Sequence, residues 1–117
     1  MKYILALLLA IATPVHATNY LQAPAPRQHA ALAPVSVSVT TSSTVAIAAN
    51  ISQTSLECTN IGTATVFLAY GSNTAIVNGG TAIAAGATWW MDDYLFTTQG
   101  INVIGSSATT LACQEFN

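Results

Sequence analysis

Short alternations of apolar and polar residues, separated by turns, fill the stretch SLECTNIGTATVFLAYGSNTAIVNGGTAIAAGATWW, from Ser55 to Trp90. Leu56 and Cys58 alternate with polar neighbours. After a short turn that contains Gly62, the strand of residues 65–70 carries Val66, Leu68 and Tyr70 on one face and Phe67 on the other. An apolar residue at every second position gives a strand one buried face. The stretch therefore predicts several short antiparallel strands, and its short first turn predicts that the first two strands pair as a hairpin.

The same alternation continues on both sides of this stretch. Strands are expected at residues 35–40, 44–49, 55–59, 65–70, 81–85, 88–91, 100–105 and 109–116. Many short strands with regularly spaced turns are typical of sandwiches. The sequence thus predicts an all-β fold, a small antiparallel β-sandwich or jelly-roll-like single domain over residues 35–117.

Two segments precede the expected domain. Residues 1–17 carry one lysine, then an apolar run and a small-residue ending at Ala17, which is the pattern of a secretory signal peptide. The alternative for this segment is a retained hydrophobic arm that touches a membrane. Residues 18–34 contain three prolines and show neither strand nor helix periodicity, so they predict an extended arm.

Charge is scarce in this chain and limits the partners it can have. Charged residues make up 5% of the sequence, against about 25% in an ordinary soluble domain. No basic patch exists, so binding to nucleic acid through its phosphates is not expected. Few charges also leave little repulsion between copies. The predicted partners are therefore further copies of the chain or other structural proteins.

The two cysteines, Cys58 and Cys113, are both expected on the inner faces of strands. Cys58 shares a face with Leu56, and Cys113 shares one with Leu111. If their strands are neighbours in an exported protein, the two form a disulfide; if not, they are buried free thiols. Export would place the protein in the periplasm, the medium or the cell surface. If residues 1–17 are not cleaved, a location in a virion or at a membrane is expected instead.

The predicted contact residues are aromatic and amide side chains. Trp89 and Trp90 are adjacent, so on a strand they point to opposite faces. The outer indole would anchor a protein or a sugar ring, unless the arm or Tyr94 covers it. Asn73 and Asn78, in the glycine-rich loop that follows residue 70, are the second group of candidate contacts.

No residue pattern indicates catalysis, a metal or a cofactor. Asp92 and Asp93 are adjacent on a strand or turn, so their carboxylates diverge, and no third ligand is evident. A nucleophilic Cys113 would need a base, and His29 in the arm is the one candidate. We therefore expect a protein that is not an enzyme.

Several motifs between residue 50 and the C-terminus carry a family resemblance. They are LECTNIG, VFLAYG, IAAGATW, INVIGSSA and LACQEF. In this order they resemble the small β-sandwich accessory or decoration modules of phage virions. The resemblance implies a structural protein of a particle. The signal-peptide pattern and the two cysteines depart from that family, whose members assemble in the cytoplasm.

Two functions follow from these observations. The first is a non-enzymatic structural protein that coats, decorates or assembles into a larger particle or fibre. The alternative is an exported β-sandwich module that binds a glycan or a protein through the outer tryptophan and the residue 71–80 loop. Membrane contact is expected only if residues 1–17 are retained.

Overall fold

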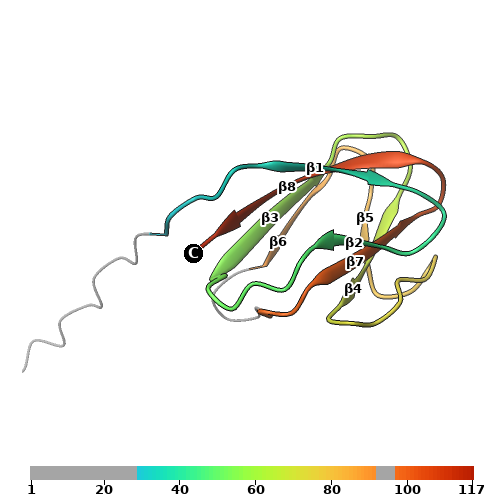
Figure 1. Ribbon diagram of the computed structural model, residues 1–117. Helices are drawn as coiled ribbons and strands as arrows, with labels where there is room; N and C mark the ends of the chain where they lie inside the picture. The colour runs from blue at the N-terminus through green and yellow to red at the C-terminus, as the bar shows by residue number, and fades with distance from the viewer. Residues whose placement is uncertain (1–28, 92–96) are drawn as a thin grey trace, which may run out of the picture.

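Two four-stranded antiparallel sheets face each other in this protein (Figure 1). The computed structural model describes residues 29–91 and 97–117, and within these ranges it contains strands but no helix. The strands are β1 (Val35–Val39), β2 (Thr44–Ile47), β3 (Ser55–Asn60), β4 (Val66–Tyr70), β5 (Thr81–Ile83), β6 (Thr88–Met91), β7 (Ile101–Gly105) and β8 (Thr109–Phe116). They occur wherever the alternation predicts strands, so the all-β prediction is confirmed.

The connections between the strands define a jelly roll. We name the sheet with the order β1-β8-β3-β6 sheet A, and the sheet with the order β2-β7-β4-β5 sheet B. The chain changes sheet at most connections, and among the described strands β4 and β5 are the one consecutive pair that lies side by side. Two sheets linked in this way form a jelly roll of two Greek keys.

The turn after β3 connects the two sheets and does not make a hairpin. β3 pairs with β6 and β8, whereas β4 pairs with β5 and β7. The side chain of Asn60, fully buried at the end of β3, stabilises this connection. Its amide nitrogen donates to the carbonyls of Ala64, at 2.7 Å, and Ile83, at 3.0 Å, and so ties the turn to sheet B. The predicted hairpin is therefore wrong.

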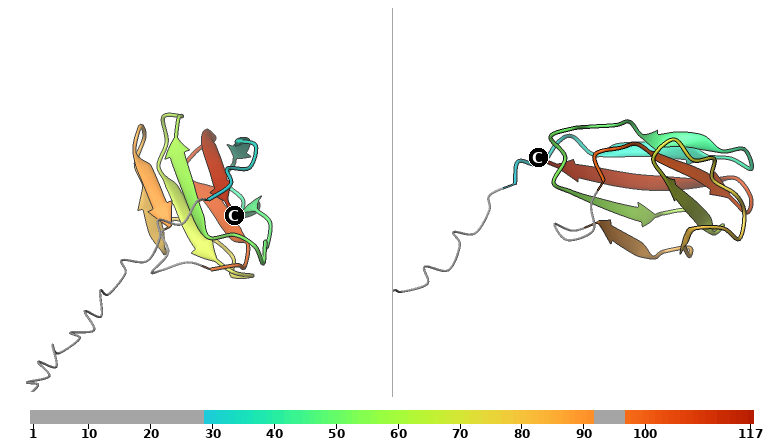
Figure 2. Two further views of the ribbon diagram at one scale, coloured as in Figure 1. Left: turned by 90° about the vertical axis from the view of Figure 1, so that its left-hand side faces the viewer. Right: turned by 90° about the horizontal axis from the view of Figure 1, so that it is seen from below.

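The main core lies between the sheets and receives side chains from every described strand. Alternate residues of each strand point inward, as the period of two requires. Figure 2 shows the two layers from two further directions. The buried members of this core are Val39, Ile47, Leu56, Cys58, Val66, Leu68, Ile83, Met91, Ile101, Val103, Leu111 and Cys113.

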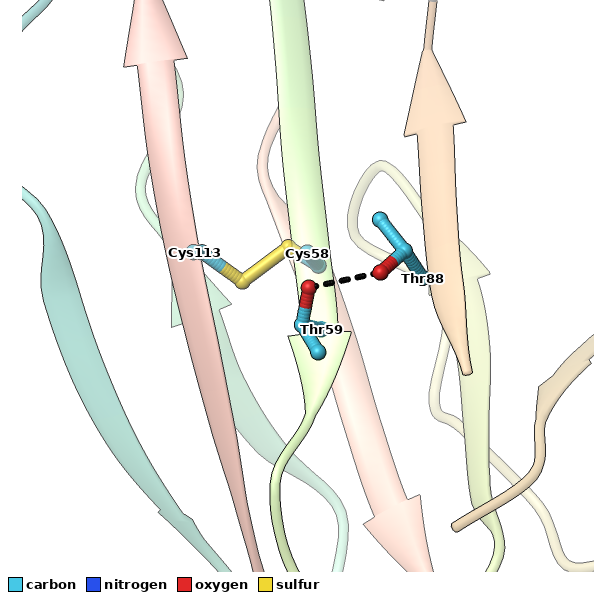
Figure 3. Close-up of a disulfide and its surroundings, with 4 residues drawn as sticks. All are labelled: Cys58, Thr59, Thr88 and Cys113. Carbon is cyan, nitrogen blue, oxygen red and sulfur yellow. Dashed lines mark hydrogen bonds between the residues drawn. A yellow bond between two sulfur atoms is a disulfide. The ribbon is translucent and has the colours of Figure 1, made fainter. Parts of the chain in front are cut away.

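Cys58 and Cys113 form a disulfide within sheet A (Figure 3). The two residues are direct partners in the register of β3 and β8, and their Cα atoms are 4.1 Å apart. Both side chains belong to the main core and are shielded from solvent. Of the two arrangements that the sequence left open, the structure has the disulfide, because β3 and β8 are neighbours.

A second, smaller apolar cluster lies on the outer face of sheet B. Phe67 and Ile104 point away from the main core, and Ala75 from the loop between β4 and β5 packs on them. The backbone N–H of Ala75 donates to the hydroxyl of Ser43 at 2.9 Å. The loop of residues 71–80 is therefore folded back on the sheet.

Residues 30–32 continue along the end of β8, beyond β1. The amides of Ala30 and Leu32 donate to the carbonyls of Asn117 and Glu115, both at 2.9 Å. Figure 1 shows this segment beside the C-terminus. The last residues of the predicted arm thus lie against the domain.

Part of the sequence-based prediction falls outside the described residues. This applies to the signal peptide at residues 1–17, to residues 18–28 of the arm, and to Asp92, Asp93 and Tyr94. In the two described ranges, no helix is long and apolar enough to cross a membrane.

Candidate interaction surface

The side chains considered as candidates for catalysis, Cys113 and His29, both make contacts within the domain. Among residues 29–91 and 97–117, no three His, Cys, Asp or Glu side chains are grouped so that they could hold a metal ion. The disulfide leaves Cys113 without a thiol for nucleophilic attack. His29 lies with its Nδ1 2.8 Å from the hydroxyl oxygen of Thr54. Of the residues predicted to bind partners, Trp89, Trp90, Asn73 and Asn78 are described by the structure, and Tyr94 lies outside the described residues.

The two adjacent tryptophans have different environments. Trp89 lies opposite Cys58 in the register of β6 and β3, so it points inward and packs against the main core. Its ring also contacts the ring of Tyr70 at the end of β4, with centroids 6.0 Å apart. Trp90 points to the outer face of sheet A and is 63% exposed. Trp90 is therefore the outer of the two indoles.

A polar row crosses the outer face of sheet A beside Trp90. In the strand register, Trp90 lies opposite Glu57, and Glu57 lies opposite Gln114. An indole next to a carboxylate and an amide offers an apolar ring face together with hydrogen-bonding groups. A shallow depression of about 180 Å³ adjoins this row and is lined by Pro34, Glu57, Thr59, Ala112, Cys113 and Gln114. The arrangement places an exposed aromatic ring beside polar side chains on one face of sheet A.

The hydroxyls of Thr59 and Thr88 meet across the outer face of the same sheet. Their oxygens are 2.8 Å apart, between β3 and β6, as Figure 3 shows beside the disulfide. Cross-strand threonine pairs of this kind stabilise a sheet. The contact holds the short strand β6, and with it Trp90, against β3.

Asn73 and Asn78 help to build the loop that covers sheet B. The side-chain amide of Asn73 donates to the backbone carbonyl of Tyr70 at 2.7 Å, and the backbone carbonyl of Asn73 accepts from the side chain of Asn102, also at 2.7 Å. Asn78 has a positive φ of 62°, which asparagine tolerates better than most residues. Both residues thus help to stabilise the conformation of the loop, and both are exposed to solvent.

Buried polar contacts at one end of the sandwich were not predicted from the sequence. The side-chain oxygen of Asn60 accepts from the hydroxyl of Thr109 and from the amide of Gly62, both at 3.2 Å. Together with its two donated bonds, this side chain joins β3, the following turn, β5 and β8. The signal in the sequence is an asparagine two residues before a glycine, which by itself indicates only a turn.

No protein-family model matches this chain, and no curated protein matches it. Among solved structures, a chain described as a Bacillus endospore appendage, from a family of disulfide-linked pili, is similar in outline. The match covers 82% of this chain and 94% of that chain, with 16% sequence identity and a TM-score of 0.44. A likeness at this level carries no argument about this chain. The resemblance to phage modules holds for the all-β sandwich, and its virion-specific part stays a prediction.

Proposed function

We propose that the protein is a non-enzymatic structural subunit that assembles with copies of itself, or with other structural proteins, into a larger particle or fibre. The observation that carries this proposal is the composition of the surface. In the described ranges, Glu57 and Glu115 are the only Asp, Glu, Lys or Arg residues, while nine large apolar side chains are exposed. Such a surface offers little repulsion between copies, and its apolar groups gain free energy when they are covered.

The proposal includes export from the cytoplasm. A structural disulfide such as Cys58–Cys113 persists in oxidising compartments and is rare in the cytosol. The signal-peptide pattern of residues 1–17 supports the same location. Decoration of a virion is the finer form of this function, and the motifs that resemble phage modules support it.

Sedimentation velocity of the purified, non-reduced protein tests the assembly. Over about a hundredfold range of concentration, we expect the mass to rise from one subunit to defined oligomers or particles, by mass action. A chain that begins at Thr18 is the control for association through the apolar residues 1–17. A monomer at the highest concentration, in both forms of the chain, would contradict the proposed function.

Binding of a glycan is the second candidate function, and the exposed Trp90 beside Glu57 and Gln114 favours it. If this face binds a sugar ring, replacing Trp90 with alanine should weaken the affinity for that sugar at least about tenfold. The measurement is titration calorimetry with the oligosaccharides that bind in a prior screen. Ile76→Ala is a matched control, since Ile76 is also 63% exposed but belongs to the loop over sheet B. Equal affinity in the two variants would exclude this site.

A further inference from the structure

The four edge strands differ in how well they are protected from pairing with another chain. β5 has three residues and β6 has four, and the register of β2 against β7 is broken between Val45 and Ile47. Short edges and bulges both hinder the addition of a further strand. In contrast, β1 has five residues, an unbroken register with β8 and no charged side chain. It is the least protected edge of the sandwich.

The hydrogen bonds of β8 show which of its residues face β1. The carbonyl of Phe116 accepts from the amide of Thr54, which precedes β3, at 2.8 Å. The carbonyl of Glu115 accepts from the amide of Leu32, which precedes β1, at 2.9 Å. Since successive residues of a strand direct their backbone groups to opposite sides, the odd-numbered residues of β8 bond toward β1.

This pattern fixes the direction of the backbone groups in β1. Its three valines lie opposite odd-numbered residues of β8, so their N–H and C=O groups are directed toward β8. Ser36 and Ser38 lie between the valines, and their N–H and C=O groups therefore point away from the sheet. Both serines are exposed. The free edge of β1 thus offers two donors and two acceptors.

The free edge ends on both sides of β1. Pro34, the residue before the strand, has no N–H group to donate. The carbonyl of Thr40, the residue after the strand, accepts a hydrogen bond from the backbone N–H of Gly105 in sheet B at 2.8 Å. The outward N–H and C=O groups of Ser36 and Ser38 are therefore the complete pairs on this edge, with Val37 at its centre.

We propose that β1 is the contact between copies, where it pairs antiparallel with β1 of a second copy and Val37 lies on the two-fold axis. In this register, Ser36 of each copy lies opposite Ser38 of the other. Each of these two pairs exchanges two backbone hydrogen bonds, as antiparallel ladders require. Sheet A then continues without interruption into sheet A of the second copy. The inference rests on the proposed function and names the surface of one step of it, the pairing of two copies, since a two-fold contact closes at two subunits.

The side chains of β1 are also complementary to themselves. Serine opposite serine brings no like charges together. Val35, which is 42% exposed, would lie opposite Val39 of the second copy and lose contact with water. An isologous contact needs only one kind of surface, which this edge supplies. Pairing of five residues buries far less surface than the roughly 1,200 Å² of stable complexes. The affinity between two copies is therefore low, and the paired state forms only at high protein concentration.

The test uses two substitutions at one position in the full, non-reduced chain. Ser38→Pro removes an outward N–H and leaves the bonds between β1 and β8 in place, since proline is tolerated on an edge strand when its missing N–H faces solvent. Ser38→Thr keeps the N–H and is the matched control. Sedimentation velocity over the same concentration range should show association of the wild type and of Ser38→Thr, and its loss in Ser38→Pro.

Hydrogen exchange of the wild type provides a second readout that does not depend on a variant that folds. The amides of Ser36 and Ser38 should exchange rapidly in dilute protein and at least about tenfold more slowly in the assembled state. Protection of these amides already in the monomer would show that the chain's own residues cover the edge, and would overturn the inference.

Two further outcomes separate this inference from the proposed function. In the first, Ser38→Pro associates as strongly as the wild type, and the amides of Ser36 and Ser38 in the assembled wild type exchange rapidly. This result would place the contact between copies elsewhere on the molecule and would leave the proposed function standing. A wild type that stays monomeric at every concentration would overturn both.

Discussion

At the scale of single residues, Asn60 is the polar side chain on which one end of the sandwich depends. It is fully buried, and all of its hydrogen-bonding groups have partners: it donates to two carbonyls and accepts from a hydroxyl and an amide. A buried amide with its bonds made stabilises a unique arrangement, whereas its removal leaves several groups without partners. This residue therefore stabilises the turn at which the chain passes from sheet A to sheet B.

Replacing Asn60 with alanine should lower the free energy of unfolding by roughly 3 kcal/mol, because buried carbonyls of the turn and of β5 lose their donor. The measurement is a urea titration followed by tryptophan fluorescence. Asn73→Ala is the control: its side chain is exposed and donates a hydrogen bond to the carbonyl of Tyr70, so a loss below about 1 kcal/mol is expected. Equal losses in the two variants would contradict the role of Asn60.

At the scale of strands, the position of β8 between β1 and β3 has two consequences. It brings Cys113 directly opposite Cys58, which permits the disulfide. It also leaves β1 at the edge of sheet A, where its outward backbone groups have no strand beside them among the described residues. The position of β8 thus allows the covalent link between β8 and β3 and makes β1 an edge strand.

The disulfide should contribute strongly to stability, since it links residues that are 55 positions apart. A loop of this length restricts the unfolded chain by roughly 4 kcal/mol. The double variant Cys58→Ala, Cys113→Ala should therefore unfold at a clearly lower urea concentration than the oxidised wild type. Wild-type protein unfolded in the presence of a reductant is the control, because it keeps both sulfur atoms in the core. Identical midpoints with and without reductant would show that the bond adds nothing.

At the scale of the whole molecule, the two sheets enclose an apolar core and present an outer surface with few charges. Every described strand places apolar side chains in the shared core. The outside, in contrast, has very few charges and several exposed apolar residues, among them Val45 and Trp90. Charge on edge strands is a usual protection against pairing between copies, and the four edges of this sandwich lack it. The molecule is therefore suited to association through sheet edges.

The sequence by itself determined the eight strands, their inward faces and the scarcity of surface charge. Alternation is a local property, so Leu56 and Leu111 could be assigned to inner faces before any partner strand was known. The inward direction of both cysteines followed from the same periodicity. For the same reason, the sequence showed that Trp89 and Trp90 face opposite ways.

Only the tertiary structure decided which strands are neighbours. A strand with one apolar face can pair with any other strand of that kind, so alternation did not distinguish a hairpin of β3 and β4 from their separation into two sheets. It likewise could not show that β8 inserts beside β3, that Trp90 is the outer indole, or that β1 forms an edge. These features depend on contacts between residues far apart in the chain, such as Cys58 and Cys113, because only the packing of both sheets around one core sets the order of the strands.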